Sequence, residues 1–292
     1  SMVFNYRTES TILKDRKAFT LVELLVVVAV LALLASIVFS NLTGAREQAK
    51  ISNALSFQSN MHNLLGADLV GWWNFDDDTG NIAKDSSGYG NNGTIVGATR
   101  VDGIPGTGGK AMSFNGSGNY ITIDGENDIL FEGSPFTISL WFNPLTIPSS
   151  GSYARLVTFK TDTSYPFGIG LSQGSSYNGL YFGSSGAFAP RKTDYIPEIG
   201  KYDHIVVSYA GGDVSMASNY TFFLNGNKWN TSSSSSWGSA PNESIIGAKG
   251  GTSYFFNGFI DDVRVYSRAL KASEIQTLYA QTKGKYLSEK AN

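Results

Sequence analysis

The amino-acid sequence predicts an α+β protein, in which a long N-terminal α-helix is followed by an antiparallel β-sandwich. Three observations lead to this fold class. Residues 19–39 form one almost wholly apolar run. Beyond about residue 68, short alternating segments are separated by turns rich in Gly, Asn, Ser and Asp. The composition agrees, because 33 glycines and 13% aromatic residues suit a β protein with many tight turns.

The composition also excludes several kinds of site. The 292 residues include no cysteine, which rules out disulfides, cysteine-ligated zinc and thiol catalysis. The two histidines, His62 and His204, lie far apart in the sequence, so a multi-histidine metal centre is excluded. His204 lies in a predicted strand, and we interpret it as structural. The net charge of -2 and the absence of an evident basic patch predict no nucleic-acid partner.

The N-terminal region has the pattern of a membrane-inserted helix. About twenty apolar residues are needed to cross the hydrocarbon core of a bilayer, and residues 19–39 meet that length. Basic residues among residues 2–18 predict a cytoplasmic N-terminus. The run is longer than the core of a secretory signal peptide, so we favour a retained helix. A helical period continues through residues 51–65, and the expected helix spans residues 19–66.

The segment KAFTLVELLVVVAVLALLAS resembles the prepilin-type cleavage and methylation motif of type IV pilins and type II secretion pseudopilins. The resemblance covers residues 14–65 and rests on a basic leader, a small residue, a phenylalanine and one acid within the apolar run. It implies a leader, residues 1–18, that prepilin peptidase removes between Ala18 and Phe19, with methylation of the new amine. Ala18 stands where the family usually has glycine, and Ser40 where its helix usually has proline.

Glu23 is the one acid in the apolar run. A carboxylate in lipid is unfavourable, so it is expected to have an interaction partner or a functional role. The resemblance implies that Glu23 pairs with the amine of Phe19 of a neighbouring subunit, and that the chain forms a helical filament with its own copies through residues 19–65. The expected location is the inner membrane for the precursor and the cell surface for the filament.

Several C-terminal segments, in order, resemble the laminin-G-like, concanavalin A-like jelly-roll domains of surface proteins. They include LVGWWNFDDDTG, DSSGYGNNGTIVGAT, FTISLWFNP and FNGFIDDVRVYSRALKASEIQTLYA. The alternation within FTISLWFNP is typical of a strand between two layers, and Asn225-Gly226 after an apolar run predicts a hairpin turn. The expected sandwich spans residues 67–281, followed by a tail of residues 282–292.

The second resemblance implies a structural Ca²⁺. Calcium prefers carboxylate, amide and carbonyl oxygens, and the predicted ligands are Asp85 and Asn91 in the loop DSSGYGNNG, with Asp261 and Asp262 in FIDDV. The closely spaced glutamates that glycosidases of this fold use are missing from the sequence, so we predict no catalytic residues and no enzyme activity.

A surface glycan or protein is the expected ligand of the sandwich. Aromatic residues in loops are typical of sugar sites, and the candidates are Tyr89, Trp237 and Tyr254. The predicted function is that of a pilus subunit that displays a lectin-like sandwich for adhesion. The alternatives are a minor pilin or pseudopilin of a secretion or DNA-uptake system, and a membrane-anchored lectin-like surface protein.

Overall fold

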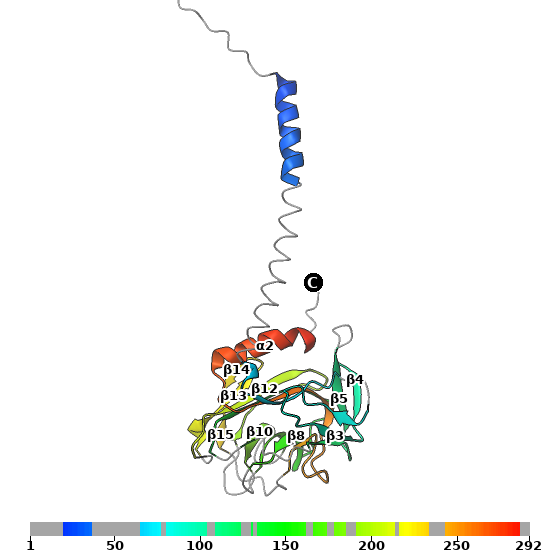
Figure 1. Ribbon diagram of the computed structural model, residues 1–292, viewed down its shortest axis with the longest axis vertical. Coiled ribbons are helices and arrows are strands. Elements are labelled where there is room, and N and C mark those ends of the chain that lie inside the picture. Colours follow the sequence, from blue (N-terminus) through cyan, green and yellow to red (C-terminus); the bar gives the residue numbers. More distant parts are fainter. Residues whose placement is uncertain are drawn as a thin grey trace, which may run out of the picture. The chain divides into compact units, whose positions relative to one another are not determined.

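The chain divides into two compact units, residues 1–60 and 61–292 (Figure 1). The computed structural model describes residues 20–36, 65–76, 80–103, 109–123, 130, 133–161, 166–173, 178–184, 191–213, 216–233 and 243–286. The helix of the first unit and the antiparallel sandwich of the second confirm the α+β fold class.

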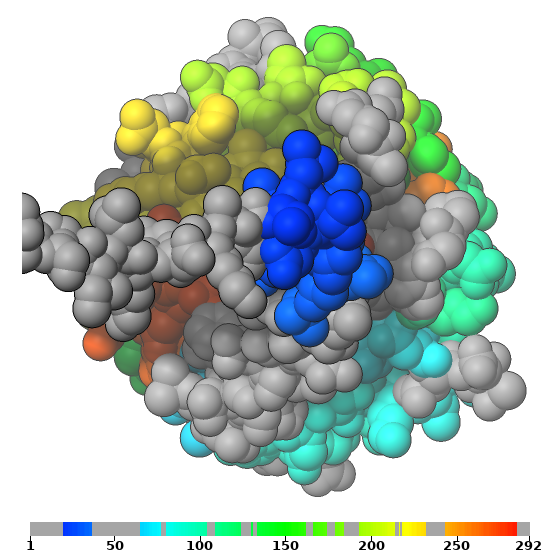
Figure 2. Space-filling model, turned by 90° about the horizontal axis from the view of Figure 1, so that it is seen from above, coloured from blue at the N-terminus to red at the C-terminus, as the bar shows by residue number. Residues whose placement is uncertain are grey.

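The first unit contains a helix over residues 21–36, drawn in blue in Figures 1 and 2. Leucine, valine and alanine dominate it, and no proline or glycine interrupts it. This is shorter than the predicted helix of residues 19–66, because residues 37–64 lie outside the described residues. Residues 65–66 are again helical, and a turn then leads into the first strand of the second unit.

One sheet of the sandwich has eight strands within the described residues. Their order is β14-β13-β12-β7-β17-β5-β4, and β1 pairs with β17. All of these pairs are antiparallel. The strands are β1 (Leu69–Trp73), β4 (Thr99–Asp102), β5 (Lys110–Asn115), β7 (Phe136–Pro144), β12 (Asp203–Tyr209), β13 (Tyr220–Leu224), β14 (Asn227–Trp229) and β17 (Asn257–Tyr266), and the 3₁₀ turn η1 (Ala217–Asn219) precedes β13.

The other sheet has nine strands within the same described ranges. Their order is β15-β11-β10-β9-β8-β16-β6-β3-β2, again antiparallel throughout. The strands are β2 (Ile82–Ala83), β3 (Gly93–Val96), β6 (Tyr120–Ile123), β8 (Ser152–Phe159), β9 (Phe167–Gln173), β10 (Asn178–Ser184), β11 (Arg191–Lys192), β15 (Ser232–Ser233) and β16 (Ile245–Ile246).

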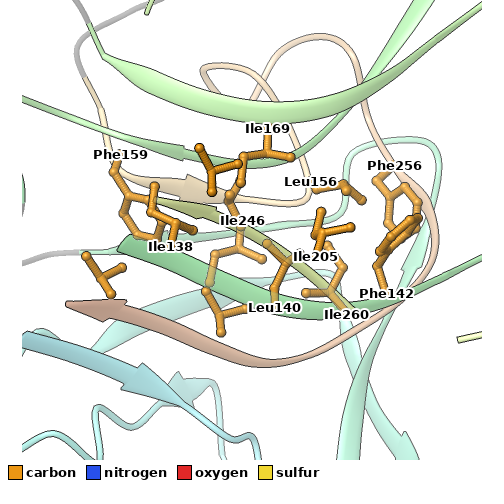
Figure 3. Packing of buried hydrophobic residues seen from close by; sticks show 14 of the residues in the cluster. Ile138, Leu140, Phe142, Leu156, Phe159, Ile169, Ile205, Ile246, Phe256 and Ile260 are labelled. Atoms are coloured by element: carbon orange, nitrogen blue, oxygen red, sulfur yellow. The ribbon is translucent and has the colours of Figure 1, made fainter. Parts of the chain in front are cut away.

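The main core lies between the two sheets, as Figure 3 shows. Strand β7 contributes every second side chain from Phe136 to Phe142 to this core, which confirms the predicted alternation. Ile205 of β12 and Ile260 of β17 lie on the same side, and residues of β8, β9 and β16 face them. Burial of each such side chain stabilises the fold by about 1.5–3 kcal/mol relative to exposure.

A C-terminal helix, α2 (Ala272–Tyr286), covers the outer face of the eight-stranded sheet (Figure 1). Ile275 and Leu278 of α2 pack with Val206 of β12 and Phe223 of β13 in a second apolar cluster. The helix continues past residue 281, so its last turn occupies part of the region predicted as a tail.

Candidate assembly and binding sites

Glu23 lies in the first turn of the helix of residues 21–36 and forms a capping box with Thr20. The Thr20 amide and hydroxyl both donate to Glu23 Oε2 at 2.9 Å, and the Glu23 amide donates to Thr20 Oγ1 at 3.2 Å. These bonds provide acceptors for N–H groups that have no partner within the helix at its start. The Thr-x-x-Glu spacing is the sequence signal for this local partner. Ala18 and Phe19 lie outside the described residues, so cleavage and methylation there stay predictions.

The side chains of residues 21–36 are exposed around the whole helix. Among the large apolar ones, the exposed fraction runs from 48% at Val27 to 79% at Leu21. A helix that is apolar on all sides is stable only when lipid or protein covers it. None of the helices in the described ranges has the length and apolar character needed to cross a membrane.

Asp85 is buried and organises the loop that carries it. Its Oδ1 accepts hydrogen bonds from the amides of Trp72 and Ser87, both at 2.9 Å. Its Oδ2 accepts from the Ser87 hydroxyl at 2.8 Å and from the Asn91 amide at 2.9 Å. Four donors occupy the four lone-pair positions of a carboxylate. Asp85 and Asn91 therefore lie together, and their contact is a hydrogen bond.

Asp262 lies on the other side of Trp72. Its Oδ1 accepts from the indole nitrogen of Trp72 at 2.7 Å and forms an ion pair with Arg264 at 3.0 Å. The strand pairing of β17 shifts between Asp261 and Arg264, and Asp262 has φ 49° at that irregularity. Asp261 is fully buried, and its carboxylate accepts the Asp262 amide at 2.6 Å.

The four predicted calcium ligands do not fit a calcium site in this arrangement. Both oxygens of Asp85 already accept hydrogen bonds, and the Asn91 side-chain amide donates to the Val70 carbonyl at 2.8 Å. Among the described residues, no three His, Asp or Glu side chains gather in a group that could hold a metal ion. Calcium binding stays a prediction, and it requires other donors to leave Asp85.

His204 lies between the eight-stranded sheet and α2. Its Nε2 is 2.8 Å from the Ser139 hydroxyl, and its ring contacts those of Trp141 and Tyr279 at centroid distances of 4.9 and 5.8 Å. Burial lowers the pKa of His204 to about 3, so the ring stays neutral near pH 7. Within the described part of the chain, Nδ1 has no hydrogen-bond partner. A buried, stacked ring agrees with the structural interpretation.

The structure describes two of the three glycan candidates. Tyr89 is 60% exposed on the Asp85 loop, where its amide lies 3.3 Å from the Ser87 hydroxyl. Trp237 lies outside the described residues. Tyr254 is half-buried beside β8, and its carbonyl accepts the Arg155 amide at 2.8 Å.

Tyr254 belongs to a cluster that the sequence analysis did not identify. The ring of Tyr153 contacts those of Tyr254 and Tyr181 edge-on, at centroid distances of 5.3 and 5.8 Å. The Lys249 ammonium lies 4.9 Å from the Tyr254 ring, and the Arg155 guanidinium 5.6 Å from the Tyr181 ring. No local spacing signals this cluster, because its members come from β8, β10 and the turn after β16.

Several solved structures are similar to the sandwich. Domain 4 of AbnA, an extracellular GH43 arabinanase from Geobacillus stearothermophilus in complex with arabinotriose, is 24% identical with a TM-score of 0.52, over 73% of this chain and 98% of that one. The botulinum neurotoxin serotype D binding domain is 11% identical (TM-score 0.53; 75% and 52% of the two chains). Trypanosoma rangeli sialidase in complex with sialic acid is 16% identical (TM-score 0.52; 83% and 40%). Identities this low show the fold alone.

Two family profiles match the chain, and both confirm the resemblances drawn from the sequence. Residues 13–39 match the prokaryotic N-terminal methylation motif. Residues 115–276, more than half of the chain, match the concanavalin A-like lectin/glucanases superfamily. A search among curated proteins finds no match. The chain therefore belongs to the concanavalin A-like lectin/glucanases superfamily and carries the N-terminal methylation motif of type IV pilin leaders.

Proposed function

We propose that this chain is a type IV pilin-like subunit that assembles through its N-terminal helix and displays the sandwich at the cell surface. The observation that carries the proposal is the methylation motif of residues 13–39, which continues into a helix with an exposed apolar surface. Glu23 is the one charged residue of the described helix. Lipid covers such a helix before assembly, and other copies of the same helix cover it in a filament.

The second half of the proposal is that the sandwich is an adhesive binding module. The superfamily match supports a lectin-like role, and so does the arabinotriose bound to the similar arabinanase domain. Retaining and inverting glycosidases use two carboxyl groups that flank the scissile bond. The sequence contains no closely spaced pair of glutamates, and this favours binding over hydrolysis.

Mass spectrometry of filaments sheared from native cells tests the filament. We expect this chain in the filament fraction, beginning at N-methylated Phe19. Its abundance separates a shaft subunit from a minor pilin. A matched culture with an inactive prepilin peptidase is expected to retain residues 1–18 and to release no chain. Chains that occur only in membranes and still carry residues 1–18 in normal cells would contradict the proposal.

A further inference from the structure

The outer face of the nine-stranded sheet carries two cations and three tyrosines in one cluster. We call Lys249, Tyr254, Tyr153, Arg155 and Tyr181 the Lys249 site. The Tyr153 ring contacts the other two rings edge-to-face. Arg155 lies over the Tyr181 ring, and Lys249 lies over the Tyr254 ring. Lys249, Tyr153 and Tyr254 are partly exposed, whereas Arg155 and Tyr181 are buried beneath them.

A short turn holds Lys249 and Tyr254 beside one another. The Lys249 amide donates to the Ser253 carbonyl at 2.9 Å, and the Thr252 amide donates to the Lys249 carbonyl at 3.2 Å. Tyr254 has φ 52°, a backbone conformation that bulky residues rarely adopt. Such conformations gather at binding sites, where the surrounding structure holds them in place.

Lys249 carries a charge that the structure leaves without a carboxylate. Within the described ranges its ammonium forms no ion pair or side-chain hydrogen bond. Partial burial, and next the positive charge of Arg155, lower the pKa of Lys249. Two neighbouring positive charges raise the local potential, and an anion that binds there relieves their repulsion.

Glycines in β9 leave room for the two buried members of the Lys249 site, Arg155 and Tyr181. A Cβ atom at Gly168 would lie 2.6 Å from Arg155 Nη1, and one at Gly170 would lie 2.7 Å from the Tyr181 hydroxyl. On the same face, the hydroxyls of Ser172 and Thr158 are buried and have no hydrogen-bond partner among the described residues. Unpaired buried hydroxyls are unfavourable unless a ligand or water reaches them.

We propose that the Lys249 site binds an oligosaccharide that carries a carboxylate. Lys249 pairs with the carboxylate, and the faces of Tyr254 and Tyr153 contact the apolar side of the sugar ring. Arg155 adds positive potential from below without contacting the ligand. This inference rests on the proposed adhesive function and specifies its ligand class, since a neutral sugar offers no carboxylate to the Lys249 ammonium.

Isothermal titration calorimetry on the full chain in detergent micelles tests the inference. The acidic probes are trigalacturonic acid and 3′-sialyllactose, and their neutral counterparts are galactotriose and lactose. We expect at least one acidic probe to bind about tenfold more tightly than its neutral counterpart, as a partly buried charge-assisted contact implies. Lys249→Gln is expected to remove that difference.

Lys228→Gln is the matched control, because Lys228 is exposed on β14 of the other sheet. We expect this variant to bind like the wild type, and both variants to keep the wild-type melting temperature. Binding of no acidic probe, equal binding of acidic and neutral probes, or an unchanged Lys249→Gln variant would overturn the inference. The filament experiment uses no saccharide, so methylated filaments that bind no acidic probe contradict this inference alone.

Discussion

At the scale of single residues, two buried polar side chains of the sandwich differ in how fully they are hydrogen-bonded. Asp85 has all of its acceptor positions filled by donors from its own loop and from β1. His204 has one ring nitrogen paired and one without a described partner. A satisfied carboxylate fixes a loop, whereas a desolvated imidazole makes stability depend on pH.

Asp85→Asn is expected to destabilise the sandwich even in a metal-free buffer. The new amide group places N–H donors where the amides and hydroxyl around Asp85 need an acceptor. Leaving buried donors unpaired lowers the free energy of unfolding by about 1–3 kcal/mol. Urea unfolding of the full chain in detergent, followed by tryptophan fluorescence in excess chelator, measures the loss.

Asp102→Asn is the control, because Asp102 is exposed and its one described ion pair is with Lys110. We expect a smaller loss there than at Asp85, and an equal loss would refute the role given to the Asp85 loop. The calcium prediction is tested with the wild type and Asp85→Asn in a buffer without chelator. A rise in melting temperature on adding calcium to the wild type, absent in Asp85→Asn, would confirm it.

We expect the free energy of unfolding to decrease as the pH falls, because His204 is buried in its neutral form. Its folded pKa of about 3 lies below the ordinary 6.5, so between those pH values the unfolded chain takes up a proton that the folded chain does not. The contribution is fully present above about pH 6.5 and is lost as the pH falls toward 3. In His204→Gln, the free energy of unfolding should depend less steeply on pH in this window. Equal slopes in denaturation curves from pH 4 to 7 would contradict this.

At the scale of elements, regular patterns were predictable and long-range register was not. The alternation in β7 placed its core residues correctly. The Asn225-Gly226 turn is confirmed between β13 and β14, with φ 49° and 77°. By contrast, the pairing of Arg155 with Gly170 depends on which strands become neighbours. That choice is made by the packing of the whole sandwich, so no local sequence pattern carries it.

The N-terminal helix gives an element-level prediction about assembly. Thr20→Val keeps the side-chain shape and removes the hydroxyl that both donates to and accepts from Glu23. Loss of a cap destabilises a helix start by about 1 kcal/mol. We expect fewer sheared filaments from cells with Thr20→Val, as quantified by immunoblot.

Thr20→Ser supplies the control for the same position. It keeps the hydroxyl and is expected to restore filament yield to the wild-type level. Reduced yield in both variants would show that the methyl group of Thr20, and not the capping box, matters for assembly.

At the scale of the whole molecule, two separate units carry two separate signals. The methylation motif lies within residues 13–39, and the superfamily match within residues 115–276. The first was visible as one short local motif, and the second as several segments in a characteristic order along the chain. The Lys249 site was not visible, since folding brings Arg155, Tyr181 and Lys249 together from distant segments.

The two glycines beneath Arg155 and Tyr181 bear on how relatives of this protein are recognised. Strand β9 runs Phe-Gly-Ile-Gly-Leu from Phe167 to Leu171, with core residues on one face and bare backbone on the other. A relative that keeps Arg155 and Tyr181 in these positions must also keep both glycines, because a Cβ atom at either would collide with those side chains. A Gly-x-Gly strand paired with an arginine on one side and a tyrosine on the other is therefore the pattern to look for in related sequences.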